Sequence, residues 1–307
     1  MVATHRKLPI FYVVWSGGRM LPNLIVIGAM KCGTTSLHHY LDQHPEIAMS
    51  TVKEPDFFLE DHDREQRDWY EGLFADALVR GESSIRYSSF PLNDGVPERI
   101  RSLIPDARLI YIVGDPLKRI TAHWVESYYG QADRNPHAIY AQRAGRPLLE
   151  GLEDYDDPYN FYVARSRYAT QIERYLEAFP ASQILVLDQS DLMERRVETL
   201  QEAFRFLGVD DTFESRVFME KQNVGVNRRR RLGAYSHVRR HVMAVGVERL
   251  PVRVRRPVGR GLARVFSRPV RRPHLDATTL PGLTALLREE TDRLRELTGK
   301  PFASWSV

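Results

Sequence analysis

Short apolar runs alternate with amphipathic segments along most of this 307-residue chain. The clearest apolar runs, each predicted to be a buried strand, are Leu24–Ile27, Leu109–Val113 and Ile184–Leu187. Amphipathic spacing with glycine or proline boundaries predicts helices over about 34–43, from 116 to about 129, over 195–207, and from 281 to the glycine at 299. Alternating strands and helices are typical of a parallel sheet flanked by helices, so the predicted fold class is α/β.

The remaining segments indicate how this domain is bounded. We expect one domain over residues 21–307, preceded by a poorly ordered extension at 1–20 in which Met20 is the preferred start. Gly81–Tyr87 is predicted to pass from a strand into a loop, and the polar stretch Gly130–Pro158 is predicted to be a lid or an insertion. The apolar runs, Ile10–Trp15 among them, are far shorter than the ~20 residues of a membrane-spanning helix.

Composition excludes several classes of protein. The 43% of hydrophobic residues is enough for a packed core and excludes wholesale disorder. The single cysteine, Cys32, cannot form an internal disulfide, so a disulfide-stapled secreted domain is disfavoured. His38, His39 and Asp42 share a predicted helix, but no further ligand at metal-binding spacing follows them, and the Gly-x-Ser-x-Gly motif of serine hydrolases is absent from the sequence.

The net charge of +4 hides an uneven distribution. Between Arg228 and Arg272 stand 15 arginines and one acidic residue, whereas the rest of the chain holds 29 basic and 39 acidic residues. Apolar residues three or four positions apart predict an arginine-rich helical extension within 228–272, interrupted later by prolines. A solvated flap, peripheral contact with an anionic membrane and a groove for an anionic sugar polymer are the open interpretations; nucleic-acid binding ranks last, because no nucleic-acid module accompanies the arginines.

The most informative segment is the turn over residues 28–36, which reads GAMKCGTTS between the first strand and its helix. Such a turn directs backbone N–H groups and the positive end of the helix dipole at an anion, and its two glycines permit the close approach. A Walker A loop places lysine directly after the second glycine, whereas here Lys31 comes before it. The segment therefore predicts a P-loop-like anion site that differs from that of an ATP-dependent kinase.

These residues resemble a known family. Ile25–Leu37, which reads IVIGAMKCGTTSL, is similar to the 5′-phosphosulfate-binding loop of sulfotransferases that use 3′-phosphoadenosine 5′-phosphosulfate (PAPS). Further segments that resemble the bacterial and heparan-sulfate-type branch are Lys53–Phe58 (KEPDFF), Gly81–Tyr87 (GESSIRY), Leu109–Tyr128 and Leu294–Trp305. The resemblance spans roughly Leu21 to Trp305 and implies the family's P-loop-like nucleotide-binding fold.

The resemblance also implies roles for single residues. Lys31 would lie against the bridging oxygen of the phosphosulfate, and Glu54 would be the general base that takes the acceptor's proton. The 5′-phosphate would be held by Cys32, Gly33, Thr34, Thr35 and Ser36. Burial beside Phe57 and Phe58 is expected to desolvate Glu54 and make it more basic. Glu82 is expected to fix its loop through hydrogen bonds rather than to act in catalysis.

The chain departs from the family pattern at the 3′-phosphate site. The family reads Arg-Asp/Asn-Pro, then Arg, then Ser-His-Tyr; here Gly114 stands at the first arginine and Ala122 at the serine. Arg119 aligns with the second arginine, which is usually more structural. Contacts to charged groups are typically worth ~1.5–3 kcal/mol each, so the two replacements matter for donor binding.

Three explanations of this departure stay open. Other cations replace the lost contacts, either Lys118 or the arginines that begin at Arg228 beside Asn227; this is the explanation we favour, because the loop and Glu54 are intact. Alternatively, the donor lacks a 3′-phosphate, as adenosine 5′-phosphosulfate does. The third explanation is a weakened or non-catalytic relative that binds a nucleotide or a membrane.

The sequence thus predicts transfer of a sulfuryl group from PAPS to a hydroxyl of a carbohydrate or glycolipid, without a required metal ion. The rival enzyme, an ATP-dependent kinase, is disfavoured by the displaced lysine. The lack of disulfides and the expected location of PAPS predict the cytoplasm of a bacterium, with contact at the inner membrane face as an open alternative.

Overall fold

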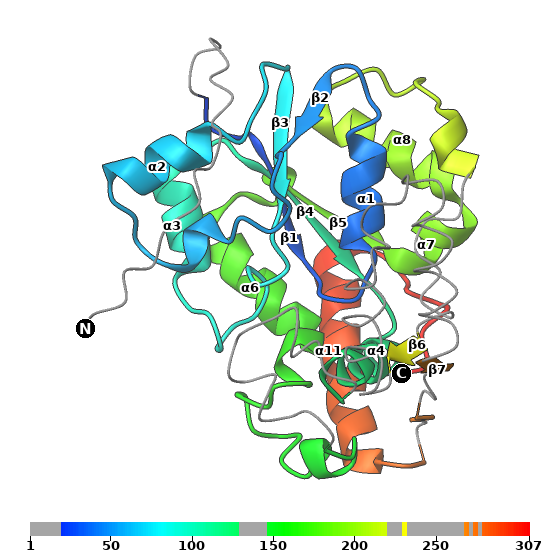
Figure 1. Cartoon of the computed structure of the whole chain (residues 1–307). Helices are drawn as coiled ribbons and strands as arrows, with labels where there is room; N and C mark the ends of the chain where they lie inside the picture. The colour runs from blue at the N-terminus through cyan, green and yellow to red at the C-terminus, as the bar shows by residue number, and fades with distance from the viewer. Residues whose placement is uncertain (1–19, 129–145, 220–228, 232–266, 270–272, 276–277) are drawn as a thin grey trace, which may run out of the picture.

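Five strands form one parallel sheet at the centre of this computed structural model (Figure 1). The structure describes residues 20–128, 146–219, 229–231, 267–269, 273–275 and 278–307. The strand order is β2-β3-β1-β4-β5 and each neighbouring pair is parallel. The strands are β1 (Leu24–Gly28), β2 (Ile47–Met49), β3 (Val79–Ser83), β4 (Arg108–Val113) and β5 (Ile184–Asp188). The predicted α/β fold class is confirmed, and the three predicted apolar strands are β1, β4 and β5.

Helices cover both faces of the sheet, with α2, α3 and α6 on one side and α1, α7 and α8 on the other (Figure 1). The described α-helices are α1 (Thr34–Leu41), α2 (Arg64–Glu71), α3 (Val96–Leu103), α4 (Pro116–Tyr128), α6 (Tyr168–Ala178), α7 (Gln189–Glu194), α8 (Arg196–Leu207) and α11 (Pro281–Thr298). The helices predicted after 34, 116, 195 and 281 all form, and α8 and α11 end at Gly208 and Gly299 as expected.

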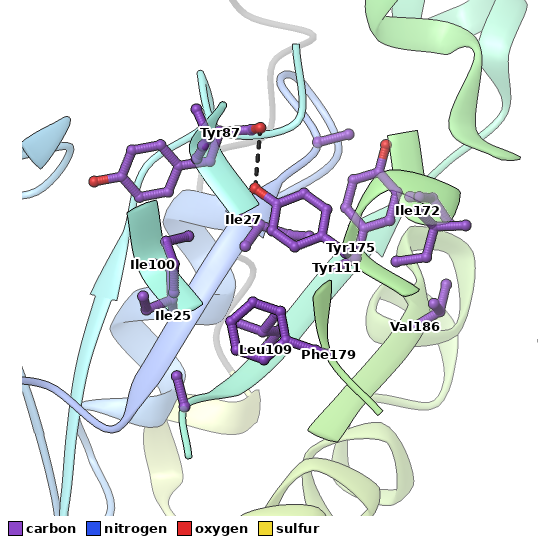
Figure 2. Close-up of a cluster of buried hydrophobic side chains, with 14 of the residues drawn as sticks. Ile25, Ile27, Tyr87, Ile100, Leu109, Tyr111, Ile172, Tyr175, Phe179 and Val186 are labelled. Atoms are coloured by element: carbon purple, nitrogen blue, oxygen red, sulfur yellow. Dashed lines mark hydrogen bonds between the residues drawn. The ribbon is translucent and has the colours of Figure 1, made fainter. Parts of the chain in front are cut away.

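Alternation along β1 decides which helices pack on which face, because successive side chains of a strand point to opposite sides. Ile25 and Ile27 belong to the cluster beneath α3 and α6, whereas Leu24 and Val26 pack with α1 and α8. Figure 2 shows the first cluster, where the Tyr175 hydroxyl also donates a hydrogen bond of 3.0 Å to the carbonyl oxygen of Tyr87. These four side chains of β1 are fully buried, as is typical of a central strand in a parallel sheet.

Two predicted segments lie mostly outside the described residues. The extension at 1–20 is described only at Met20, and the polar stretch 130–158 is described from residue 146 on. Within 228–272 the structure describes β6 (Arg229–Arg231) and β7 (Ser267–Pro269), which pair as antiparallel strands. The arginine-rich segment is therefore extended, not helical, at these two places, and its predicted amphipathic helix lies outside the described residues.

The residues after α11 return to the sheet and fasten two helix starts. The backbone N–H of Ser306 donates to Asp115 Oδ2 (3.0 Å), while Asp115 Oδ1 accepts from the backbone of Leu117 and Lys118 at the start of α4. The indole N–H of Trp305 donates to Asp188 Oδ1 (3.3 Å), which also caps α7. This strap, Phe302–Ser306, thus closes the carboxyl edge of β4 and β5.

Replacing Trp305 by alanine should loosen this edge. The side chain is 8% exposed and packs on Tyr168 and Phe302 with ring centroids at 5.6 and 4.5 Å. We expect Trp305→Ala to lower the free energy of unfolding by about 3 kcal/mol, measured by urea unfolding followed by circular dichroism. The 67% exposed Met193 is the control, because its change to alanine should stay within about 0.5 kcal/mol. Equal losses in the two variants would show that the strap is not anchored by this ring.

Candidate active site

The carboxyl ends of the parallel strands bring separate loops to one edge of the sheet. The predicted anion loop follows β1, the GESSIRY segment continues from the end of β3, Gly114 follows β4, and Gln189 follows β5. From β1 the chain continues to β2 and β3 on one side of it and then crosses to β4 and β5 on the other, so the crevice of this sheet lies at the end of β1. Most of the residues singled out by the sequence stand at this edge.

The loop after β1 is shaped by its two glycines. Gly28 has φ 146°, and a Cβ atom there would lie 1.9 Å from the Ser88 hydroxyl, so no side chain fits. Gly33 has φ 95° and is the N-cap residue of α1, which has no capping side chain and no acidic residue in its first turn. The first N–H groups of α1 therefore remain available to an anion, and Thr34, Thr35 and Ser36 form that turn.

Lys31 stands inside this loop and reaches across to α4. Its Nζ lies 2.8 Å from Glu126 Oε2, and the two side chains are 17% and 26% exposed. Glu126 is one helical turn after Ala122, so both residues share the face of α4 that turns toward the loop. Lys31 has φ 71°, a left-handed conformation that costs a non-glycine residue roughly 1–2 kcal/mol. Such outliers concentrate at functional sites.

The segment around Glu54 differs from expectation. Glu54 is exposed, with 38% of its side chain accessible, and forms an ion pair with Lys53. Phe57 and Phe58 instead turn into the core, where Phe57 stacks on Tyr70 with ring centroids 4.0 Å apart. The expected burial of Glu54 beside these phenylalanines is therefore wrong, because their rings turn into the core while its carboxylate stays exposed beside Lys53.

Glu54 is nevertheless connected to the anion loop through its backbone. Its N–H donates to the Ser83 carbonyl oxygen at 3.0 Å, and the Ser83 hydroxyl lies 3.0 Å from His38 Nδ1 on α1. Burial of His38, with Lys53 nearby, lowers its pKa to about 4, so the ring is neutral near pH 7. Ser83 thus joins the helix of the anion loop to the segment that carries Glu54. No sequence pattern predicts this contact, since His38 and Ser83 lie far apart in the chain.

Glu82 holds the same segment from the interior of the protein. It is fully buried and accepts hydrogen bonds from Tyr70 (2.7 Å), Ser84 (2.7 Å) and Tyr87 (3.0 Å). The Ser84 hydroxyl accepts from the backbone N–H of Asp56, and the Tyr87 hydroxyl accepts from that of Phe58. Burial outweighs these donors and raises the pKa of Glu82 to about 7. The predicted role, fixing a loop through hydrogen bonds, agrees with this geometry.

Two other predicted site residues are interior. Cys32 is fully buried with its Sγ 3.5 Å from the Tyr168 hydroxyl, and burial raises its pKa to about 11, so its side chain packs in the interior beneath the loop. Arg119 is 2% exposed and donates to the Ser166 hydroxyl and the Tyr162 carbonyl oxygen. Its guanidinium therefore holds α4 to the segment before α6, as expected of the more structural arginine.

Of the cations that could replace the lost 3′-phosphate contacts, the structure describes Lys118 but not Arg228. Lys118 is 74% exposed and lies 3.2 Å from Asp115 Oδ2. Asn227 and Arg228 lie outside the described residues. Gly114, which is buried, and Ala122, which is half-buried, are the positions where the family pattern has its arginine and serine. Both lie at this edge of the sheet. Within the described residues, no group of three or more His, Cys, Asp and Glu side chains is placed to hold a metal ion.

The chain is similar in sequence to known proteins. A family model described as "Sulfotransferase domain" matches residues 21–231. The chain is 29% identical over 221 residues to the mouse bifunctional heparan sulfate N-deacetylase/N-sulfotransferase 1, covering 66% of this chain and 24% of that protein. It is 26% identical over 217 residues to the corresponding protein 2 of Bos taurus, covering 64% and 23%. The chain thus spans about a quarter of the length of these relatives.

A solved structure agrees on the fold. The crystal structure of a sulfotransferase from Alicyclobacillus acidocaldarius aligns with a TM-score of 0.53 at 24% identity, covering 67% of this chain and 88% of that one. Among the described helices, none combines the length and the apolar character that crossing a membrane requires.

The buried Glu82 predicts a pH dependence of stability. Its pKa is about 7 when folded and near 4.5 when unfolded, so between these values the unfolded chain ionises and the folded chain does not. Stability from this group is therefore complete below about pH 4.5 and is lost as pH rises through about 7. Relative to Glu82→Gln, the wild-type free energy of unfolding should fall by about 3 kcal/mol between pH 4.5 and 8.

Urea unfolding of both proteins across this range measures the effect, and other carboxylates cancel in the difference. Glu60→Gln, at an exposed position, should leave the pH profile unchanged. Parallel profiles for wild type and Glu82→Gln would contradict the burial of an ionisable Glu82.

Proposed function

The chain belongs to the sulfotransferase domain family, and from this premise we propose that it transfers a sulfuryl group from PAPS to a hydroxyl of a carbohydrate or glycolipid. The observation that carries the proposal is the path from α1 through Ser83 to Glu54. It links the uncapped start of α1 to the segment that carries the Glu54 carboxylate, and Lys31 lies in the loop just before α1. An anionic donor and a nucleophilic acceptor need these groups side by side. Domain bounds of 21–307 remain part of the proposal.

The donor loop would bind the phosphosulfate through positive dipoles and one charge. The free N–H groups of the first turn of α1 and the hydroxyls of Thr34, Thr35 and Ser36 suit the 5′-phosphate. Lys31, held near the loop by Glu126, would neutralise charge on the bridging oxygen as the sulfur–oxygen bond breaks. Glu126 then acts as a counter-ion that keeps Lys31 in place before the donor arrives.

Glu54 would serve the acceptor. As the acceptor oxygen bonds to sulfur, its proton passes to the carboxylate, and the products are the sulfated acceptor and adenosine 3′,5′-bisphosphate. Sulfuryl transfer has a loose, in-line transition state like phosphoryl transfer, so positioning and charge stabilisation dominate. The exposed carboxylate is available to an acceptor, which would compete with Lys53 for it. Relatives named for heparan sulfate support a carbohydrate, and their name adds a sugar amine as a second acceptor to test.

Calorimetric binding of nucleotides tests the donor. We expect adenosine 3′,5′-bisphosphate to bind more tightly than AMP, and ATP with Mg²⁺ to bind more weakly, because the lysine does not stand where a kinase needs it. AMP binding as tightly as the bisphosphate would show that the changes at Gly114 and Ala122 have removed the 3′-phosphate site. The donor would then be one without that phosphate.

Substitution of Glu54 tests the base. With PAPS and N-desulfated or O-desulfated heparan sulfate as acceptors, Glu54→Gln should lower kcat by about 10²–10⁴-fold. Binding of adenosine 3′,5′-bisphosphate should remain within about twofold, since the donor loop is untouched. Glu60→Gln, the same change at an exposed position six residues on, is the matched control. Undiminished turnover of Glu54→Gln would reject the assignment of the base.

Lys31→Ala tests the other half of the site. Loss of a charge that acts on the leaving group should lower kcat about 10²–10³-fold. Lys300→Ala, which removes a lysine paired with Glu202 instead, is the control. Equal rates for Lys31→Ala and wild type would show that the loop lysine takes no part in transfer.

A further inference from the structure

Gln189, the first residue of α7, lies against the donor loop although it is far from it in sequence. A Cβ atom at Gly33 would lie 3.7 Å from Gln189 Nε2 and 3.8 Å from its Cγ. A Cβ atom at Gly114 would lie 2.6 Å from Gln189 Oε1 and 3.3 Å from its Cβ. The missing side chain at Gly114, after β4, therefore makes room for Gln189 after β5, and at Gly33, after β1, the same side chain lies in ordinary van der Waals contact with the donor loop.

The position of Gln189 is fixed by its neighbours. Asp188 Oδ1 accepts from the backbone N–H of Ser190 (2.9 Å) and from the indole of Trp305 (3.3 Å), which holds the start of α7 to the strap. The side chain of Gln189 is half-buried, and its carboxamide forms no hydrogen bond with another residue in the described part of the chain. Its Nε2 therefore lies beside Gly33 without an acceptor among the residues that the structure describes.

We propose that Gln189 is a nucleotide-binding and specificity-determining residue of this chain, donating from Nε2 to a phosphate oxygen of the bound donor beside Gly33. This inference rests on the proposed function. The amide, with its Oε1 on that side, also fills the space at Gly114 that an arginine side chain would need, so a neutral group stands where the family resemblance expects a positive charge. Because a neutral amide attracts a dianionic 3′-phosphate less than a guanidinium does, the chain's preference for a doubly phosphorylated nucleotide is reduced.

An isosteric change of charge tests the contact. Gln189→Glu places a carboxylate against the loop, so the dissociation constants of both adenosine 3′,5′-bisphosphate and AMP should rise at least tenfold in calorimetry. Gln201→Glu on α8 makes the same change of charge outside the loop and should leave both constants within twofold. Thermal melting of each variant checks that the fold persists. Wild-type affinities for a folded Gln189→Glu would overturn the proposal.

A reciprocal exchange tests specificity and does not depend on that variant. The Gly114→Arg variant alone should bind nucleotide more weakly, because the Cβ atom of the new side chain would lie only 2.6 Å from Gln189 Oε1 and would displace it. Gly114→Arg combined with Gln189→Gly should restore binding and raise the preference for the bisphosphate over AMP at least tenfold above wild type. Identical preferences in the single and double variants would show that the two positions are not coupled and would also overturn the proposal.

The outcome for the unchanged chain separates this inference from the function it rests on. If wild type binds neither nucleotide, the donor assignment fails and the role of Gln189 fails with it. If wild type binds the bisphosphate while the Gln189 variants behave like wild type, only the inference about Gln189 fails.

Discussion

The parallel direction of all five strands is the constraint on which the site depends, because it brings every strand's carboxyl end to one edge. Residues from the loop after β1, from Gly114 after β4 and from Gln189 after β5 meet there although long helices separate them in sequence. The same edge holds α1, whose first turn has no capping side chain and no acidic residue and therefore attracts an anion. The strand order thus brings these loops together, and the residues within each loop determine which ligand the edge can bind.

A second constraint is the buried carboxylate of Glu82. Burying a carboxylate is costly unless donors surround it, and here three hydroxyls do so. Two of these hydroxyls also accept hydrogen bonds from the backbone N–H groups of Asp56 and Phe58. The exposed segment of Glu54 is therefore joined to the core by polar contacts. The apolar side of the same segment is fastened by Phe57 on Tyr70. The shape of the segment that carries Glu54 thus depends on buried groups beneath it.

Sequence patterns predicted the elements whose signals are local. Strong apolar runs marked β1, β4 and β5, and glycine or proline marked the ends of α8 and α11. The strand β2 is only three residues long, and the helix α2 is so polar that only Tyr70 is buried, so neither has the run of apolar residues that would mark it in the sequence. Proximity in sequence misled for Glu54, because neighbours along an irregular segment need not face the same way. Gln189 and His38 were beyond reach, since strand pairing and helix packing create their contacts.

The strap of Phe302–Ser306 has a consequence for the order in which the protein is made. It follows all five strands in sequence, so a ribosome delivers it after the complete sheet. Synthesis proceeds at about 5–20 residues per second, and domains generally fold as units once their residues have emerged. Until the strap docks, Asp115 and Asp188 hold the starts of α4 and α7 but lack their partners Ser306 and Trp305. This edge of the sheet therefore gains the strap after its strands, and a nascent chain that stalls before residue 302 carries the starts of α4 and α7 without the contacts that fasten them to it.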